Sequence, residues 1–311
     1  MHRFFAALIA TLFVSHMASA QTQVRSLTVG GTVRDYLLFV PDDVPAGERL
    51  PLVVLLHGGG APAELMMLYS RFNAVARRER FAVAYPRGIG RWWNDGRLPE
   101  AQAESTADDV RFIRALVADV GETLPLDRSR IFAAGISNGG FMSLRLACEA
   151  ADLFTAVAPV AATMPADVGA RCRPAKPVSL LVINGTADAY VPYVGGHARI
   201  AHALKGAIWS TERTVAFWAA QNRCAESADV RVLPDLDPSD GSRVIETEYR
   251  GCFGAEVRLL RIEGGGHTWP GGVQGLPASF IGTTNRDIDA SEAIWEFFKS
   301  AAARRPLAGS R

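Results

Sequence analysis

The sequence predicts an α/β fold in one large domain, with a mostly parallel central sheet, helices on both faces and an antiparallel hairpin at the N-terminus. The chain has 311 residues, of which 49% are hydrophobic and 21% charged, so it has enough apolar material for a substantial core. Short continuous apolar runs alternate with segments of helical periodicity. No linker rich in Pro, Ser or Gly interrupts the middle of the chain, which favours one domain.

The order of the predicted elements supports this fold. Segments 24–29 and 36–40 alternate in polarity around Gly30 and Gly31, which predicts the hairpin. Runs typical of strands buried on both faces follow at 52–56, 81–85, 131–134, 156–160 and 180–183, with further strands at 243–249 and 257–262. Helical periodicity fills 63–78, 106–124, 139–150, 210–221 and about 290–302. Strand and helix in alternation predict parallel pairing.

The first twenty residues are typical of a secretory signal peptide. Arg3 is followed by an apolar run at 4–14 and by the small residues Ala18, Ser19 and Ala20, which predicts cleavage after Ala20. The run is short for a membrane span, and no Cys follows the cleavage site for lipid attachment. We therefore expect an exported protein, extracellular or periplasmic, in which residues 21–311 form one domain.

The charge balance excludes some partners. The chain has 33 basic and 32 acidic residues, and loss of Arg3 with the signal peptide leaves a formally neutral protein. This balance gives no electrostatic basis for binding nucleic acid or an anionic membrane, so we expect neither partner. It makes no prediction about the oligomeric state.

The four cysteines predict two disulfides. An even number in an exported chain favours bridges over free thiols, and no C-x-x-C pair suggests zinc. Three connectivities are open, and we favour Cys148 with Cys172 and Cys224 with Cys252 because both are local. In the chain-entropy model each closure adds roughly 3 to 4 kcal/mol of stability.

Residues 235–241 have the acidic spacing of a calcium loop, but the pattern fails. Asp240 stands where a glycine is required, Ser239 where a strong ligand is usual, and no helix clearly precedes the segment. A hairpin turned at Asp240 and Gly241 before the strand at 243–249 explains the same residues. No metal site is therefore expected.

The pentapeptide Gly135-Ile136-Ser137-Asn138-Gly139 points to a nucleophile. It follows a buried strand and opens a helix, which is the setting of a strained turn that exposes a catalytic serine in α/β-hydrolases. Small residues are needed there because neighbouring Cβ atoms would clash. A plain turn with Ser137 capping the helix is the alternative.

A second motif, His57-Gly58-Gly59-Gly60, follows the strand at 52–56 and matches the oxyanion-hole loop of the same fold. The N–H of Gly59 or Gly60, together with that of Asn138, would stabilise a tetrahedral intermediate by on the order of 3 kcal/mol per donor. A phosphate-binding loop is disfavoured because no Lys-Ser/Thr pair follows.

His267 is the predicted base by elimination. His2 and His16 leave with the signal peptide, and His57 belongs to the oxyanion loop. The remaining pair, His197 and His202, lies on a segment that reads as a loop and a helix start. His267 follows the strand at 257–262 in a glycine-rich loop that can bring the imidazole over the serine.

Asp188 is the predicted acid because it follows the strand at 180–183, where a carboxylate can bond the imidazole. Asp167, Asp229 and Asp240 are fallbacks on less well-placed segments. The order Ser137, Asp188, His267 is that of α/β-hydrolases and predicts two-step acyl transfer without a metal or organic cofactor.

Three tryptophans are candidates for the acyl pocket. Trp92, Trp93 and Trp269 lie near the proposed site residues, and aromatic walls bind apolar or phenolic acyl groups. The alternative is that they belong to the core.

A series of motifs gives the chain its family likeness: LHGGG at 56–60, YP at 85–86, WNDGR at 93–97, DDV at 108–110, GISNGG at 135–140, NGTAD at 184–188, VPY at 191–193 and GGHTWPG at 265–271. With these motifs in order, nearly all of the mature chain resembles the extracellular polyhydroxybutyrate depolymerase and feruloyl esterase group of α/β-hydrolases.

The resemblance implies an α/β-hydrolase fold, serine-esterase activity with Ser137, Asp188 and His267 as the triad, and a bridge between Cys224 and Cys252. Asn184 departs from the group, which usually has His there, and this affects local packing alone. Depolymerases of insoluble polyester usually carry an added binding module behind a linker, and none follows the last helix here. Soluble hydroxyalkanoate oligomers or hydroxycinnamoyl (feruloyl) esters are therefore the expected substrates.

Two other functions remain open at this stage. An acyltransferase would use the same acyl-enzyme with an alcohol in place of water. A non-catalytic binding protein on this scaffold would normally lack a member of the triad, and all three candidates are present here.

Overall fold

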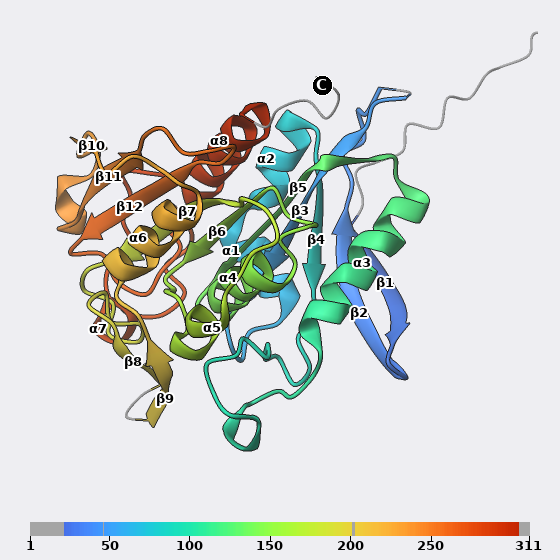
Figure 1. Cartoon of the computed structure of the whole chain (residues 1–311), viewed down its shortest axis with the longest axis horizontal. Coiled ribbons are helices and arrows are strands. Elements are labelled where there is room, and N and C mark those ends of the chain that lie inside the picture. The colour runs from blue at the N-terminus through green and yellow to red at the C-terminus, as the bar shows by residue number, and fades with distance from the viewer. Residues whose placement is uncertain (1–21, 46, 201–202, 305–311) are drawn as a thin grey trace, which may run out of the picture.

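The computed structural model describes residues 22–45, 47–200 and 203–304, so the predicted signal peptide lies outside the described residues. Within them a ten-stranded sheet has the order β1-β2-β4-β3-β5-β6-β7-β12-β11-β10 (Figure 1). Its strands are β1 (Thr22–Val29), β2 (Thr32–Phe39), β3 (Leu50–Leu56), β4 (Ala82–Pro86), β5 (Leu126–Ile136), β6 (Ala156–Val160), β7 (Ser179–Gly185), β10 (Ala228–Val232), β11 (Arg243–Tyr249) and β12 (Val257–Glu263).

The middle of the sheet is parallel, from β4 through β3, β5, β6 and β7 to β12. Antiparallel strands flank it on both edges: β2 and β1 on one side, β11 and β10 on the other. The predicted mostly parallel sheet is confirmed. Because parallel strands end at the same edge, the segments that follow β3, β5, β7 and β12 meet at one end of the molecule.

The N-terminal hairpin forms as predicted. Val29 pairs with Thr32, so Gly30 and Gly31 make a two-residue turn. Both have positive φ, 58° and 83°, which is the backbone of the turn type that matches the twist of paired strands.

Helices cover both faces of the sheet (Figure 1). Alternating residues of β3 show the division, because Leu52 and Val54 face one apolar cluster and Val53 and Leu55 face the other. The first cluster includes side chains of α3 (Asp109–Thr123), α4 (Asn138–Glu149) and α6 (Thr211–Gln221). The second includes those of α1 (Ala63–Ser70), α2 (Phe72–Glu79) and α8 (Ala290–Ala303).

The predicted helix at 63–78 is two helices. The chain breaks at Arg71, which has a left-handed backbone with φ of 53° and ends α1 through its N–H bond to Met67 O. The Ser70 hydroxyl then accepts a bond from Phe72 N at the start of α2. Neither Gly nor Pro marks this break in the sequence. The helical periodicity of residues 63–78 continues across it, and one helix was therefore predicted.

Several smaller elements were not predicted: the helices α5 (Ala166–Arg171) and α7 (Ala278–Ile281), the strand β10 and a separate two-stranded sheet of β8 (Gly196–Ile200) and β9 (Ala203–Ile208). His197 therefore lies on a strand and not in a loop, and His202 lies outside the described residues. Strands β10 and β11 pair antiparallel, but the connection between them is longer than the tight turn expected at Asp240 and Gly241. Leu233 N bonds Val244 O, and a short 3-10 helix at Pro238–Asp240 lies within the connection.

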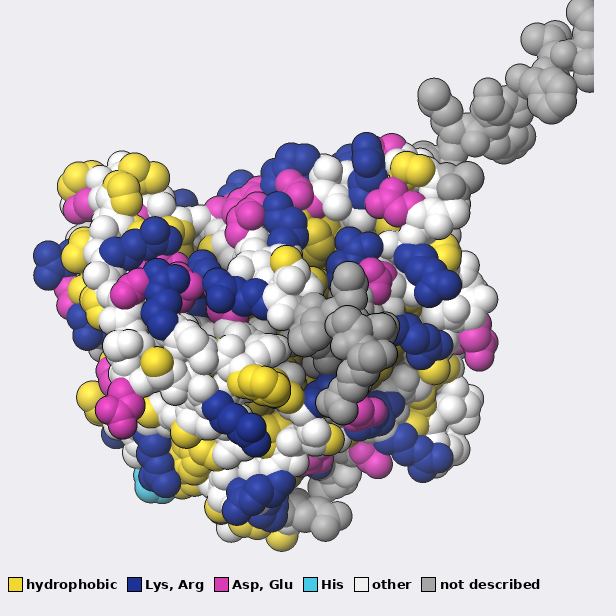
Figure 2. All heavy atoms as spheres, turned by 45° about the horizontal axis from the view of Figure 1, so that its top comes forward, with side chains coloured by type: hydrophobic (Ala, Val, Ile, Leu, Met, Phe, Trp, Pro, Cys, Tyr) yellow, Lys and Arg dark blue, Asp and Glu magenta, His cyan; other side chains and the backbone are white. Residues whose placement is uncertain are grey.

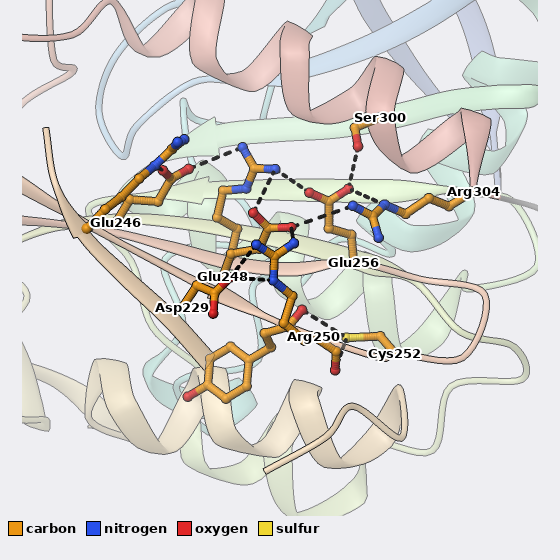
Figure 3. A network of polar contacts seen from close by, with 11 residues as sticks. Asp229, Glu246, Glu248, Arg250, Cys252, Glu256, Ser300 and Arg304 are labelled. Carbon is orange, nitrogen blue, oxygen red and sulfur yellow. Dashed lines mark hydrogen bonds and ion pairs between the residues drawn. The ribbon is translucent and has the colours of Figure 1, made fainter. Parts of the chain in front are cut away.

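An ion-pair network holds the outer antiparallel strands to the last helix (Figure 3). Arg258 on β12 pairs with Glu246 on β11, at 3.2 Å, and with Glu256. Glu256 also accepts a 2.7 Å bond from the Ser300 hydroxyl of α8 and lies 3.3 Å from Arg304. The network thus fixes α8 against this edge of the sheet.

Two disulfides form with the favoured pairing. Cys148 at the end of α4 is bonded to Cys172 just after α5, and Cys224 after α6 is bonded to Cys252 after β11. Each bridge ties a helix end to a neighbouring segment. The four cysteines have no free thiol.

Two features bear on membranes and polyanions: the length and apolarity of the helices, and the distribution of charged side chains on the surface. No helix among residues 22–45, 47–200 and 203–304 is both long and apolar enough to cross a bilayer. On the face shown in Figure 2, basic and acidic side chains lie beside one another.

A buried ion pair ties β2 to α3 and supports a prediction. Arg34 Nη2 lies 2.7 Å from Asp109 Oδ1, with 4% and 0% of the two side chains exposed, and burial raises the pKa of Asp109 above its ordinary value. Arg34→Met leaves the carboxyl group without its cation, so we expect the free energy of unfolding to fall by about 3 kcal/mol in urea denaturation. Arg114→Met is the control, because Arg114 and Asp152 form an exposed pair and should contribute under about 1 kcal/mol. Equal losses in the two variants would contradict the prediction.

Candidate active site

The turn that carries Ser137 is strained and tightly packed. Ser137 joins β5 to α4 with φ of 56° and ψ of −120°, and its hydroxyl makes no capping bond to the helix. A Cβ on Gly139 would lie 2.3 Å from Leu56 O, and one on Gly135 would lie 2.6 Å from the backbone of Gly139. The turn is held by the bond from Ser137 N to Val160 O. Both glycines are therefore required by close backbone contact, and the serine side chain is free of a structural role.

Asp188 and His267 form a direct hydrogen bond. His267 Nδ1 lies 2.7 Å from Asp188 Oδ2, and the buried carboxylate accepts two further bonds at Oδ1, from the N–H groups of Tyr190 and Val191. The Tyr190 ring lies beside the imidazole, with 5.2 Å between centroids. A carboxylate fixed in this way sets the imidazole tautomer with its proton on Nδ1 and leaves Nε2 to act as a base.

Backbone contacts hold the loops after β7 and β12 together. Ala187 N donates to Gly265 O at 2.9 Å, and Gly264 N donates to the Thr186 hydroxyl at 3.0 Å. A Cβ on Gly185 would lie 2.1 Å from Gly265 O. The glycines of these loops therefore allow the close approach that brings the carboxylate to the imidazole.

The loop after β3 presents bare backbone N–H groups. Gly60 N donates to Arg91 O at 2.9 Å, so it is already bonded. In the described part of the chain the N–H of Gly59 has no acceptor, and neither has that of Asn138 in the first turn of α4. Of the two predicted glycines, Gly59 is thus the one with a free donor.

The Asn138 side chain has a separate role, which sequence reasoning missed. Its amide oxygen accepts a bond from Trp93 N, and its nitrogen donates to Trp93 O and to Asp95 Oδ2. Asp95 is in turn paired with Arg97 at 2.8 Å in a buried position. The WNDGR motif at 93–97 was the sequence signal for this support of the turn at Ser137.

His57 is a structural residue of the loop after β3. Its Nδ1 donates to Gly58 O at 2.9 Å and its Nε2 accepts from Gly88 N at 3.0 Å, so both nitrogens are used by the neutral ring. Only 1% of the residue is exposed, and this burial lowers the pKa of His57 below its ordinary value.

A cavity of about 640 Å³ opens over the site, and both Ser137 and His267 line it. The loop after β3, the helix α1 and the segment after Trp269 form its walls. Side chains on these walls are mostly apolar: Leu65, Met66, Tyr69, Leu276 and Ile281. A second cavity of about 700 Å³, beside the β1–β2 hairpin, contains none of the predicted site residues.

The three predicted aromatic residues do not line this cavity. Trp93 and Trp269 lie in the core, where their indole N–H groups donate to His57 O and to the Ser291 hydroxyl. Trp92 packs against Gly59. A buried indole needs an acceptor for its N–H, and both core tryptophans find one inside the protein. Tyr69 of α1 is the aromatic residue in the lining.

The other candidate residues have different surroundings. Asp167 is exposed on α5, Asp229 pairs with Arg250 in the network of Figure 3, and Asp240 accepts bonds from Ser242.

Asn184, the departure from the family pattern, is buried at the end of β7 and bonds the backbone of Ala162 and the hydroxyl of Thr211. It therefore joins the ends of two strands to the start of α6. No group of three or more His, Cys, Asp or Glu suited to a metal ion occurs among the described residues.

The fold is that of the α/β-hydrolases. Acetyl xylan esterase from Aspergillus awamori shares it with a TM-score of 0.60 and 13% identity, over 89% of this chain and 99% of that one. The likeness shows the fold that the motifs predicted.

Sequence comparison places the chain within a family. Residues 34–203 match the family described as "Esterase PHB depolymerase". NocK of Nocardia uniformis subsp. tsuyamanensis, an esterase by name, is 33% identical over 290 residues, 90% of this chain and 83% of that protein. Feruloyl esterase B of Piromyces equi is 28% identical over 249 residues, 78% of this chain but 44% of its own length. The chain belongs to the esterase family of polyhydroxybutyrate depolymerases and is a carboxylic ester hydrolase of this type.

The neutral His57 predicts a pH dependence of stability. Its pKa is lowered in the folded state, so below about pH 6.5 the unfolded chain binds a proton that the folded protein does not. The stability that this group contributes is present above pH 6.5 and is lost as the pH falls toward the folded-state pKa, at up to about 1.4 kcal/mol per pH unit. In urea denaturation from pH 7 to pH 5, His57→Gln should therefore lose less stability than the wild type.

The control is His197→Gln, because His197 is exposed on β8. It should keep the pH dependence of the wild type. An unchanged slope in His57→Gln would show that His57 is not the titrating group.

Proposed function

We propose that this protein is a secreted serine esterase that hydrolyses carboxylic esters through Ser137, His267 and Asp188. The observation that carries the proposal is the 2.7 Å bond between His267 Nδ1 and Asp188, in a site where His267 shares a cavity with Ser137. The strained backbone of Ser137 adds support, because it exposes a hydroxyl that does not cap the helix.

In the proposed mechanism, Ser137 Oγ attacks the ester carbonyl while His267 Nε2 takes its proton. Asp188 stabilises the imidazolium through the Nδ1 proton, and the N–H groups of Gly59 and Asn138 bind the oxyanion. His267 then returns the proton to the leaving alcohol. Water, activated by the same imidazole, hydrolyses the acyl-enzyme and releases the acid.

The proposed substrates are soluble hydroxyalkanoate oligomers or hydroxycinnamoyl esters. The family description and the feruloyl esterase relative support these two classes. A cavity of about 640 Å³ with mostly apolar walls accepts a short acyl chain or a phenolic acid. An acyltransferase would use the same acyl-enzyme but transfer the acyl group to an alcohol. Analysis of the products formed in dilute alcohol distinguishes the two activities. Predominant formation of the exchanged ester would overturn hydrolysis.

We further propose that residues 21–311 form one catalytic domain, exported after cleavage behind Ala20. One sheet takes up strands from residue 22 to residue 263, which supports a single domain. Two disulfides support an oxidising compartment.

Loss of the nucleophile tests the mechanism. Ser137→Ala should lower kcat for 4-nitrophenyl butyrate by about a thousandfold or more. Ser143→Ala is the matched control, because Ser143 lies on the same helix and its hydroxyl donates to Gly140 O. Full activity in Ser137→Ala would overturn the assignment.

Loss of the acid tests the role of Asp188. Asp188→Asn keeps the shape but favours the wrong imidazole tautomer, so kcat should fall by about 10³-fold or more. Asp167→Asn, an exposed change on α5, should leave kcat unaltered. Equal rates for the two variants would exclude Asp188 as the partner of the base.

A further inference from the structure

Arg91 brings a permanent charge to the cavity over Ser137. Among the described residues that line the cavity, Arg91 is the only Lys, Arg, Asp or Glu. Its side chain is exposed, and within the described residues its guanidinium makes no ion pair and no hydrogen bond. Arg87, four residues earlier, differs because it pairs with Glu64 and Asp35. Arg91 therefore has its charge available to a ligand.

The backbone of Arg91 is fixed to the oxyanion loop. Its carbonyl accepts the bond from Gly60 N at 2.9 Å, and its N–H donates to Gly88 O at 3.0 Å. The adjacent Trp92 packs on Gly59. Arg91 also has a left-handed backbone with φ of 70°, a conformation that glycine adopts without strain. The backbone of a cationic residue is thus anchored in the lining of the cavity.

The surroundings of Arg91 limit what it can bind. Leu65, Met66, Leu276 and Ile281 supply apolar wall, which suits a hydrocarbon chain. A guanidinium binds carboxylates through charge-assisted and often bidentate hydrogen bonds. The cavity therefore combines an apolar wall with one anion-binding group.

We propose that Arg91 is a specificity-determining residue that binds a second, free carboxylate on the substrate, so that the preferred substrates are anionic esters. The inference rests on the proposed function. Such a carboxylate has two sources: the acid end of a short hydroxyalkanoate oligomer, which lies on the leaving alcohol, or the free acid of a dicarboxylic half-ester, which lies on the acyl group. Neutral hydroxycinnamoyl sugar esters carry no such group.

The contact with Arg91 lies away from the reacting carbon, so it contributes equally to binding the ground state and the transition state. Its loss should therefore raise KM and leave kcat less changed. Added salt should weaken the preference, because the pair is open to solvent.

The experiment compares matched acid and neutral substrates at pH 7. One pair is the 3-hydroxybutyrate trimer as free acid and as its methyl ester. The second is mono-4-nitrophenyl glutarate and its methyl ester. The readout is the ratio of kcat/KM for acid over neutral ester, which cancels any general loss of activity in a variant.

In the wild type this ratio should exceed one for at least one pair, and Arg91→Gln should lower it by about tenfold through KM. Arg91→Lys should retain part of it. Arg87→Gln removes the same charge nearby without touching the cavity lining and should keep the wild-type ratio.

The outcomes separate the alternatives. If the ratio for the trimer pair falls in Arg91→Gln, the carboxylate that Arg91 binds lies on the leaving alcohol. If the ratio for the glutarate pair falls, this carboxylate lies on the acyl group. Either result supports the proposal. The proposal is overturned if the acid-to-neutral ratio of kcat/KM is the same in Arg91→Gln as in the wild type, because any loss of activity is then equal on the two esters. The proposed function fails separately, if Ser137→Ala hydrolyses the neutral esters as fast as the wild type.

Discussion

The site depends on the close contact between α4 and the strand beside it. At Gly139 the carbonyl oxygens of Leu56 and His57 would lie 2.3 and 2.6 Å from any Cβ, so the helix rests directly on the end of β3. This contact sets Ser137 and the loop after β3 at a fixed separation, since both follow the two strand ends that meet there. The same packing therefore positions the proposed nucleophile and the proposed oxyanion donors.

The fold could largely be predicted from the sequence because the central strands are buried on both faces and have continuous apolar runs. The elements that escaped prediction lack such a signal. Strand β10 is an edge strand with exposed Val230 and Val232, and its pairing depends on β11. At the break before Arg71, the Ser70 hydroxyl bonds Met66 O and Phe72 N, and Ser70 O accepts a long-range bond from the Ser291 hydroxyl of α8. Local periodicity contains no information about either.

The site was predictable in part, for a related reason. Ser137, Asp188 and His267 each follow a parallel strand, so chain order alone places them at one edge of the sheet. The tryptophans show the limit of this reasoning, because Trp93 and Trp269 lie within motifs of the site yet are buried in the core, where their indole N–H groups find acceptors. The cavity wall was missed because Leu276 and Ile281 come from a largely irregular segment that contains the short helix α7 and whose course depends on tertiary contacts.

That irregular segment, between Trp269 and α8, has a consequence for how such enzymes diversify. Backbone bonds hold it at Ile281, Thr283 and Asn285, which accept from His267 N, Gly266 N and Gly271 N. Leu276 and Ile281 supply apolar wall to the cavity. We expect substitutions at Leu276, which lies outside these bonded positions, to change the shape of the pocket while the backbone bonds to the loop of His267 are kept. Variation at this place gives evolution or a protein engineer a way to alter the pocket on an unchanged scaffold.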